Sequence, residues 1–140
     1  MSDNPVLDLA AMIYGEAASE DYDTMLMVGS TAINRMNANR PQEFGATLPE
    51  VLQKGYYAVS NPNEPYKQAL EQKFPDKESE TKWKQSMAIS SGLIKGTIKP
   101  REGQFYFTEK EIKKLKKKGK KAFNFDAVKE KDGVGNYRVF

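Results

Sequence analysis

The spacing of the apolar residues changes at about residue 100, and this change constrains the fold more than any other feature of the sequence. Before it, apolar residues recur every three or four positions, as they do on one face of an α-helix. After it, apolar and polar residues alternate, which is typical of β-strands. Spacing and turn residues predict helices over about 5–18, 21–39, 49–54, 65–73 and 77–95, with loops over the rest of 41–64.

The region after residue 103 is predicted to hold the strands. An aromatic strand is expected at 104–107, a helix from the capping box at 108–111 to about residue 119, and strands at 123–127 and 137–140. The sequence therefore predicts an α+β fold, mainly helical, with a small antiparallel sheet toward the C-terminus. A length of 140 residues fits one domain, spanning 1–140.

Two helix starts carry a clear local signal. Asn4 can cap a helix whose first residue is Pro5, and Asp76 can cap the helix that Gly96 ends. The N-terminal segment has no basic stretch, so no secretory signal peptide is predicted. No apolar run reaches the ~20 residues that a membrane span requires.

The absence of two residue types restricts the chemistry. The chain has no His and no Cys, which excludes Ser-His-Asp and Cys-His nucleophiles. A catalytic zinc site is also not expected, because such sites use His and Cys ligands. The net charge is +3 and the isoelectric point is about 8.9, which suits a polyanionic partner without identifying one.

Glu16 is the acidic residue with the clearest chemical potential. It flanks the predicted buried stripe of Leu9, Ile13 and Ala17 on the first helix. A carboxyl group against apolar surface is disfavoured in its charged form, as a general acid requires. Gly15 beside it permits close approach by another segment or a ligand. The alternative is a surface Glu near a helix C-terminus, and periodicity alone favours that alternative.

A family resemblance changes this balance. Residues 13–17 (IYGEA) resemble the Y-G-E-A signature of SleB-like cell-wall hydrolases, the spore cortex-lytic enzyme family. Residues 27–36 (MVGSTAINRM) are similar to the second helix of that family, and 55–59 (GYYAV) to its G-x-F-S/T-A-V segment. Residues 103–107 (GQFYF) and 135–140 (GNYRVF) resemble its G-A-L-Y-F/Y strand and its C-terminal motif. The likeness covers about residues 9–140 in order and is weakest between 62 and 85.

The resemblance implies a lysozyme-like fold and cleavage of the MurNAc-GlcNAc β-1,4 bond of peptidoglycan. Glu16 matches the catalytic Glu of the family. The implied reaction is lytic transglycosylation, in which one carboxyl group suffices and no cofactor or metal is needed, and it leaves 1,6-anhydro-MurNAc ends. The rival predictions are a hydrolytic muramidase with two carboxylates and a non-catalytic module that binds glycan or nucleic acid.

Candidate substrate contacts are aromatic, hydroxyl and amide side chains, because sugar rings stack on aromatic faces and their hydroxyls bind amides. Those predicted from the matched segments are Asn34, Tyr57, Ser60, Asn61 and Tyr106. For Asn34 a structural role, bridging backbone groups, is as well supported. Tyr137 stands where the family usually has His, so a catalytic role of that His does not transfer.

Other charged and aromatic residues have simpler interpretations. Glu20, Asp21 and Asp23 are expected to cap the second helix, and Trp83 to lie in the core. The lysine-rich run at 113–121 is either a solvated helix face or an anion-binding patch. The expected partner is the peptidoglycan glycan strand, and nucleic acid is not expected to bind. The protein itself is expected to be a monomer. Without a leader or wall-binding repeats, the sequence looks more like a bacteriophage lysin or virion enzyme than a secreted spore enzyme. Localisation is otherwise not predicted.

Overall fold

The computed structural model describes residues 3–108, 128–131 and 136–139, with side chains described for residues 3–104. The helices of this part are α1 (Pro5–Ala17), α2 (Tyr22–Asn37), α3 (Leu48–Gly55), α4 (Tyr57–Ser60), α5 (Glu64–Glu71) and α6 (Lys77–Lys95). All helices predicted before residue 96 are confirmed within a few residues, and α4 was missed. Of the described helices, none combines the length and apolar character that crossing a membrane demands.

Side chains at the helix starts explain where the helices begin. The Asn4 side chain accepts the N–H groups of Val6 and Leu7 at the start of α1, as predicted. The carboxylate of Asp76 accepts the N–H of Ser79 at the start of α6, and Gly96 ends that helix in the left-handed region with φ +82°. The short α4 has no such side-chain cap, which is why its start carried no signal in the sequence.

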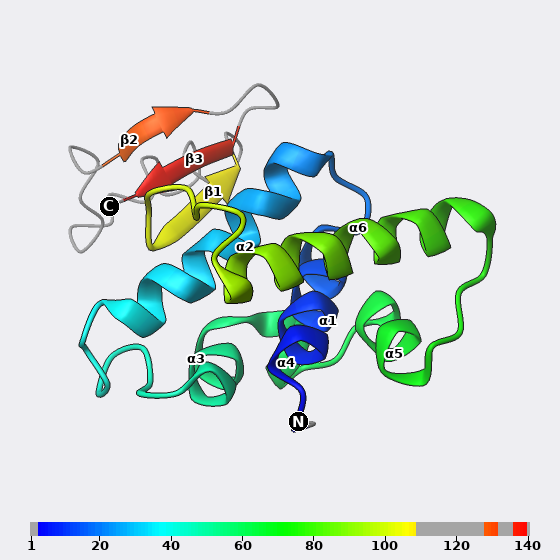
Figure 1. The fold of residues 1–140 in the computed structure, drawn as a ribbon, viewed down its shortest axis with the longest axis horizontal. Helices are drawn as coiled ribbons and strands as arrows, with labels where there is room; N and C mark the ends of the chain where they lie inside the picture. Colours follow the sequence, from blue (N-terminus) through cyan, green and yellow to red (C-terminus); the bar gives the residue numbers. More distant parts are fainter. Residues whose placement is uncertain (1–2, 109–127, 132–135, 140) are drawn as a thin grey trace, which may run out of the picture.

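Helix α1 is the centre of the molecule. It packs against α2, α5 and α6, with α3 and α4 beside it (Figure 1). Nearly the whole helix is buried, from Asp8 to Gly15 and again at Ala17. A helix that is apolar on all sides needs neighbours on all sides, and the sequence of α1 is of this kind. The other helices therefore fold around α1, and their packing fixes where its C-terminal end points.

An aromatic cluster closes the core between α1 and α6. The ring of Tyr14 meets Phe74 and Trp83 edge to face, with centroids 5.5 and 5.9 Å apart, while Phe74 and Trp83 stack at 5.7 Å. Edge-to-face and offset stacked arrangements are the favourable ones for aromatic pairs. Trp83 is 7% exposed, so its prediction as a core residue is confirmed.

The predicted α+β class is wrong. Residues 3–104 are 67% helical and contain no strand and no sheet. In that part of the chain the buried apolar cluster is formed by side chains of α1–α6 and of Tyr56, which joins α3 to α4. The layers that close a core define the fold class, and here helices close it against helices. Residues 3–104 therefore form a helical fold, and the lysozyme-like α+β expectation is corrected accordingly.

Three short strands follow the helical body, and only their backbone is described. β1 (Phe105–Thr108), β2 (Val128–Lys131) and β3 (Asn136–Val139) run antiparallel in the order β1-β3-β2. β1 lies beside α2 (Figure 1). The predicted helix at 108–119 and strand at 123–127 lie outside the described residues, except for Thr108, which ends β1.

We predict that α1 dominates the stability of the fold. Leu9→Ala removes a side chain that is 0% exposed in α1, whereas Leu70→Ala makes the same change at a side chain that is 55% exposed in α5. Burial at Leu9 should make that variant about 2–5 kcal/mol less stable. The Leu70 variant should stay within about 0.5 kcal/mol of the parent. Urea unfolding of both variants tests this, and equal losses would contradict a core centred on α1.

Candidate active site

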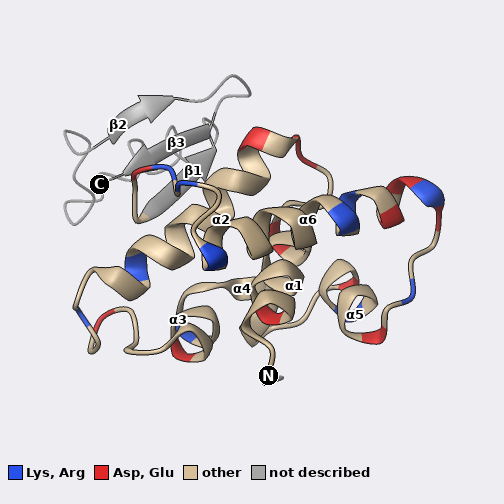
Figure 2. Ribbon diagram, viewed as in Figure 1, with Lys and Arg blue, Asp and Glu red and all other residues tan. Residues whose placement is uncertain are grey.

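Glu16 lies one residue before the end of α1, where the helix leaves the core. Its side chain is half-buried, and its Oε1 accepts the backbone N–H of Ala58 at 3.1 Å. Asp8 and Glu16 are the charged residues of α1, which is otherwise uncharged (Figure 2). The expectation that Glu16 flanks the buried stripe is met, because Ile13 and Ala17 are fully buried beside it. The carboxylate is thus fixed at the edge of the core by a backbone donor from another helix.

Gly15 explains how α4 and α5 come so close to Glu16. A Cβ at this position would lie 3.0 Å from the Cβ of Tyr66 and 3.1 Å from the Cβ of Ala58. The Gly15 carbonyl accepts the side-chain amide of Asn63 at 2.7 Å. The close approach expected at Gly15 is therefore made by two helices of the same chain. A larger side chain here would push α4 away from the carboxylate.

Three predicted substrate residues lie on or directly after α4. Tyr57, Ser60 and Asn61 are all exposed, and the Tyr57 side chain is 73% exposed. The side-chain amide of Asn61 donates to the Tyr57 hydroxyl, which fixes the two side chains relative to each other. Ala58, which donates its backbone N–H to Glu16, lies between Tyr57 and Ser60 on this helix.

Tyr56 lies under this surface and is 2% exposed. The Thr31 hydroxyl donates to the carbonyl of Val28 at 2.7 Å, so its single proton is used there. The Tyr56 hydroxyl, 2.6 Å away, therefore donates to Thr31. Burial raises the pKa of Tyr56 to about 12, against a smaller opposing effect of the Arg35 guanidinium. The negative charge of Glu16 adds a smaller effect in the same direction as burial and also raises the pKa of Tyr56.

Asn34 binds the loop before β1 and not α4. Its side-chain amide donates to the carbonyls of Arg101 and Gly103, both at 2.7 Å, and so holds the loop before β1 on α2. The structural interpretation of Asn34 is thereby confirmed. Asn34 also lines an open depression of about 340 Å³ together with Glu102, Gly103 and Gln104. That volume is within the range of ligand pockets, so a substrate contact stays a prediction.

The acidic residues after α1 have partners of their own. The Asp21 carboxylate accepts the N–H of Thr24 at 2.9 Å and caps α2, as expected. Asp23 pairs with Arg101 at 2.7 Å. Glu20 is exposed, and its backbone carbonyl accepts the Lys82 ammonium. In the part of the chain that the structure describes, no three acidic side chains group as metal ligands would.

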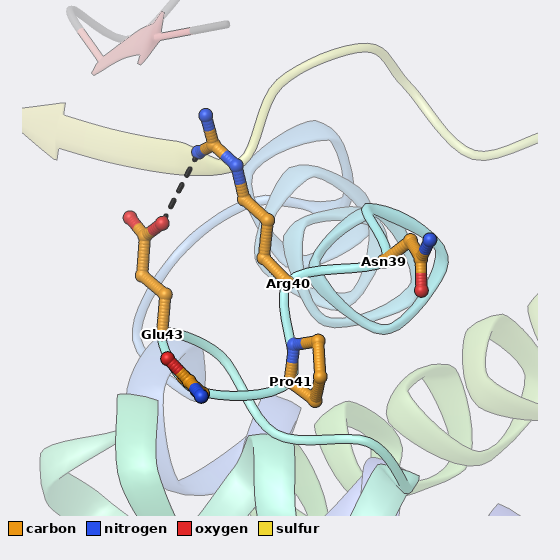
Figure 3. Close-up of a pocket in the computed structure, with 5 residues that line it drawn as sticks. Asn39, Arg40, Pro41 and Glu43 are labelled. Atoms are coloured by element: carbon orange, nitrogen blue, oxygen red, sulfur yellow. Dashed lines mark ion pairs between the residues drawn. The ribbon is translucent and has the colours of Figure 1, made fainter.

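The remaining predicted features lie elsewhere. Tyr106 is in β1, paired in register with Arg138, and its side chain is outside the description. The lysine-rich run at 113–121 lies outside the described residues altogether. A second open depression, of about 450 Å³, follows α2 and is lined by residues 39–43. An exposed ion pair between Arg40 and Glu43 stands at its edge, at 3.3 Å, so its two charges offset each other (Figure 3).

Three residues that hold the site were missed from the sequence. Tyr56 and Asn63 precede α4 and α5, and Arg35 follows Asn34 in the motif that suggested the family resemblance. Each of them contacts a group at least twenty residues away in the sequence. The motif itself held a usable signal for Arg35, because a charged residue on the buried side of α2 needs a hydrogen-bonding partner.

We predict that Tyr56 makes the fold sensitive to alkaline pH. Its pKa in the folded protein is raised from 10.0 to about 12, so the stability it contributes is complete below pH 10 and is lost as pH rises toward 12. That loss amounts to roughly 2–3 kcal/mol. Tyr56→Phe should flatten this decline, leaving the smaller effects of Tyr14 and Tyr66, whose pKa values burial also raises.

Urea unfolding between pH 8 and 11.5 measures the decline, and absorbance at alkaline pH follows tyrosine ionisation directly. Tyr22→Phe is the control, because its ring is 45% exposed at the start of α2. An unchanged decline in the Tyr56 variant would contradict the assignment.

Comparison with protein-family models, with curated proteins and with solved structures finds no match for this chain. The similarity to SleB-like hydrolases therefore rests on the short motifs described above, and it stays a prediction. Any statement of function has to be argued from Glu16 and from the contacts that surround it.

Proposed function

We propose that the chain is a peptidoglycan-degrading enzyme that cleaves the MurNAc-GlcNAc β-1,4 bond, with Glu16 as its catalytic acid and base. The reaction is lytic transglycosylation and leaves 1,6-anhydro-MurNAc ends. One observation carries this proposal: a half-buried carboxyl group is held by the N–H of Ala58, on the helix that presents Tyr57 and leads to Asn61. The motif at 13–17 supports the same residue independently of the geometry.

The first requirement of the reaction is a proton donor in a fixed place. Neutral Glu16 donates its proton to the glycosidic oxygen, and the bond from that oxygen to C1 of MurNAc breaks. The N–H of Ala58 restricts the rotation of the carboxyl group, so little rotational entropy is lost when substrate binds. Proton transfer from a positioned side chain contributes about 10²–10⁴-fold to the rate.

The second step returns the proton to the same residue. The C6 hydroxyl of MurNAc attacks C1, and the Glu16 carboxylate takes the hydroxyl proton. This closes the 1,6-anhydro ring without consuming water. Hydrolysis instead needs a second carboxylate to activate water or act as nucleophile. Asp21 caps α2 and Asp23 binds Arg101, and this engagement favours transglycosylation over the hydrolytic alternative.

The substrate side of the proposal rests on α4. An exposed tyrosine ring gives a flat apolar surface for one face of a sugar, and the adjacent amide of Asn61 suits its hydroxyl or acetamido groups. Ser60 adds a hydroxyl on the same short helix. In this proposal the glycan strand lies along α4 with its scissile oxygen at Glu16.

Glu16→Gln should lower cleavage of purified peptidoglycan by at least about 10²-fold, because the amide cannot donate and retrieve a proton. Glu20→Gln, the same change at an exposed residue just after α1, should keep full activity. Mass spectrometry of the released fragments measures both rate and product. Anhydro ends support the proposal, and reducing ends would assign the hydrolytic alternative. Full activity of the Glu16 variant, or binding of intact glycan without cleavage, would overturn it.

Tyr57→Ala should raise KM roughly 3- to 10-fold with a smaller effect on kcat. The change removes ring contacts that the substrate makes in both the ground state and the transition state. Tyr22→Ala, at another partly exposed tyrosine, is the matched control and should leave KM unchanged. Steady-state turbidity assays on wall fragments give both constants. A fall in kcat alone, at constant KM, would contradict a binding role for Tyr57.

A further inference from the structure

Arg35 is a buried cation that joins three segments of the chain. It lies on α2 and is 7% exposed. Its Nε donates to the carbonyl of Gln104 at 2.7 Å, and its Nη1 donates to the carbonyl of Gly55 at 3.3 Å. The guanidinium carbon lies 4.7 Å from the centre of the Tyr56 ring. A desolvated charge is costly unless hydrogen bonds offset it, so these contacts hold both segments firmly on α2.

The segment that Arg35 holds leads directly to Glu16. Gly55 ends α3, Tyr56 joins α3 to α4, and Ala58 donates its N–H to the Glu16 carboxylate. The backbone between the Gly55 carbonyl and the Ala58 N–H is therefore fixed at one end by Arg35 and at the other by Glu16. Tyr56 is fixed a second time within it, because its hydroxyl donates to Thr31 on α2.

The absence of a side chain at Gly55 leaves room for the Arg35 guanidinium. A Cβ added to Gly55 would overlap Nη1 of Arg35, so the guanidinium occupies the space that a side chain would need. A substitution at Gly55 can thus displace the guanidinium while Arg35 itself stays in the chain. That gives two independent ways to disturb the same contact.

The other end of the guanidinium fixes the wall of a depression. Gln104 is part of the loop that Asn34 also holds, and with Glu102 and Gly103 it lines the depression of about 340 Å³. The N–H of Arg101 in this loop donates to Ser30, also on α2, at 2.9 Å. One side chain therefore ties the wall of this depression to the segment that leads from Gly55 to Ala58.

We propose that Arg35 is the positioning residue of the Glu16 site. Its guanidinium holds the Gly55 carbonyl and the Tyr56 ring, and so sets the Ala58 N–H that orients the Glu16 carboxylate. This inference rests on the function proposed above for Glu16. The planar fork of arginine is what the arrangement uses, because it directs two N–H groups to two carbonyls while its face covers a ring. Lysine keeps the charge but has neither the plane nor the fork.

Arg35→Lys is the test variant, and Arg40→Lys is its matched control. Arg40 is 56% exposed and pairs with Glu43 just beyond the same helix. The Arg35 variant should lose roughly 10- to 100-fold in kcat, because the carboxyl group is misplaced, with a smaller change in KM, because the Tyr57 ring and Asn61 still face the glycan. The control should keep both constants. If Arg35→Lys does not fold, Gly55→Ala replaces it, with the same expectation.

Amide hydrogen exchange tests positioning without relying on catalysis. Protection of the Ala58 N–H should fall at least tenfold in the Arg35 variant, while that of Ile89, buried in α6, should change less than twofold. A parallel fall at Ile89 would indicate a general loss of stability and overturn the proposal, as would unchanged kcat and unchanged Ala58 protection. If the parent protein cleaves no glycan, the function proposed for Glu16 fails, yet the exchange result still decides whether Arg35 positions Ala58.

Discussion

Burial of α1 on all sides is the constraint on which the rest of this structure depends. A helix with apolar residues around its whole circumference has to be covered by other helices, and α2, α5 and α6 supply most of that cover. The close contact at Gly15 brings α4 and α5 to the end of the same helix. Glu16 follows directly, so the packing that stabilises the core also determines the surroundings of its carboxylate.

Polar contacts then link the core to the exposed surface of α4. The Glu16 carboxylate accepts a hydrogen bond from the N–H of Ala58. Arg35 donates one to the carbonyl of Gly55, three residues before Ala58. Between them Tyr56 is buried, with its hydroxyl directed to Thr31 and its pKa raised by desolvation. Buried polar groups are stable when they are hydrogen-bonded, and such a network also holds its members in one arrangement. The function proposed for Glu16 requires such a fixed carboxyl group, because proton transfer depends on the position of the donor.

Sequence patterns predicted the helices well and the fold class poorly, for identifiable reasons. α1 and α6 begin at Asn4 and Asp76, whose side chains cap the backbone locally, so the signal and the structure lie within a few residues. Four-residue α4 has neither a cap nor a period to detect, and its place depends on Glu16, forty-two residues earlier. The aromatic alternation after residue 103 suggested an α+β class, yet the core of residues 3–104 is closed by helices alone.

The sequence by itself determined that this chain lacks His and Cys chemistry, that α1 carries an apolar stripe of Leu9, Ile13 and Ala17, and that Glu16 flanks this stripe. These are properties of composition and of local spacing, which need no knowledge of distant contacts. Only the tertiary structure decided that Ala58 holds Glu16, that Asn34 holds the loop at 101–103, and that Arg35 connects Gly55 with Gln104. Each of these bonds joins segments at least twenty residues apart. No local pattern specifies such a partner, because it is chosen by how whole helices pack.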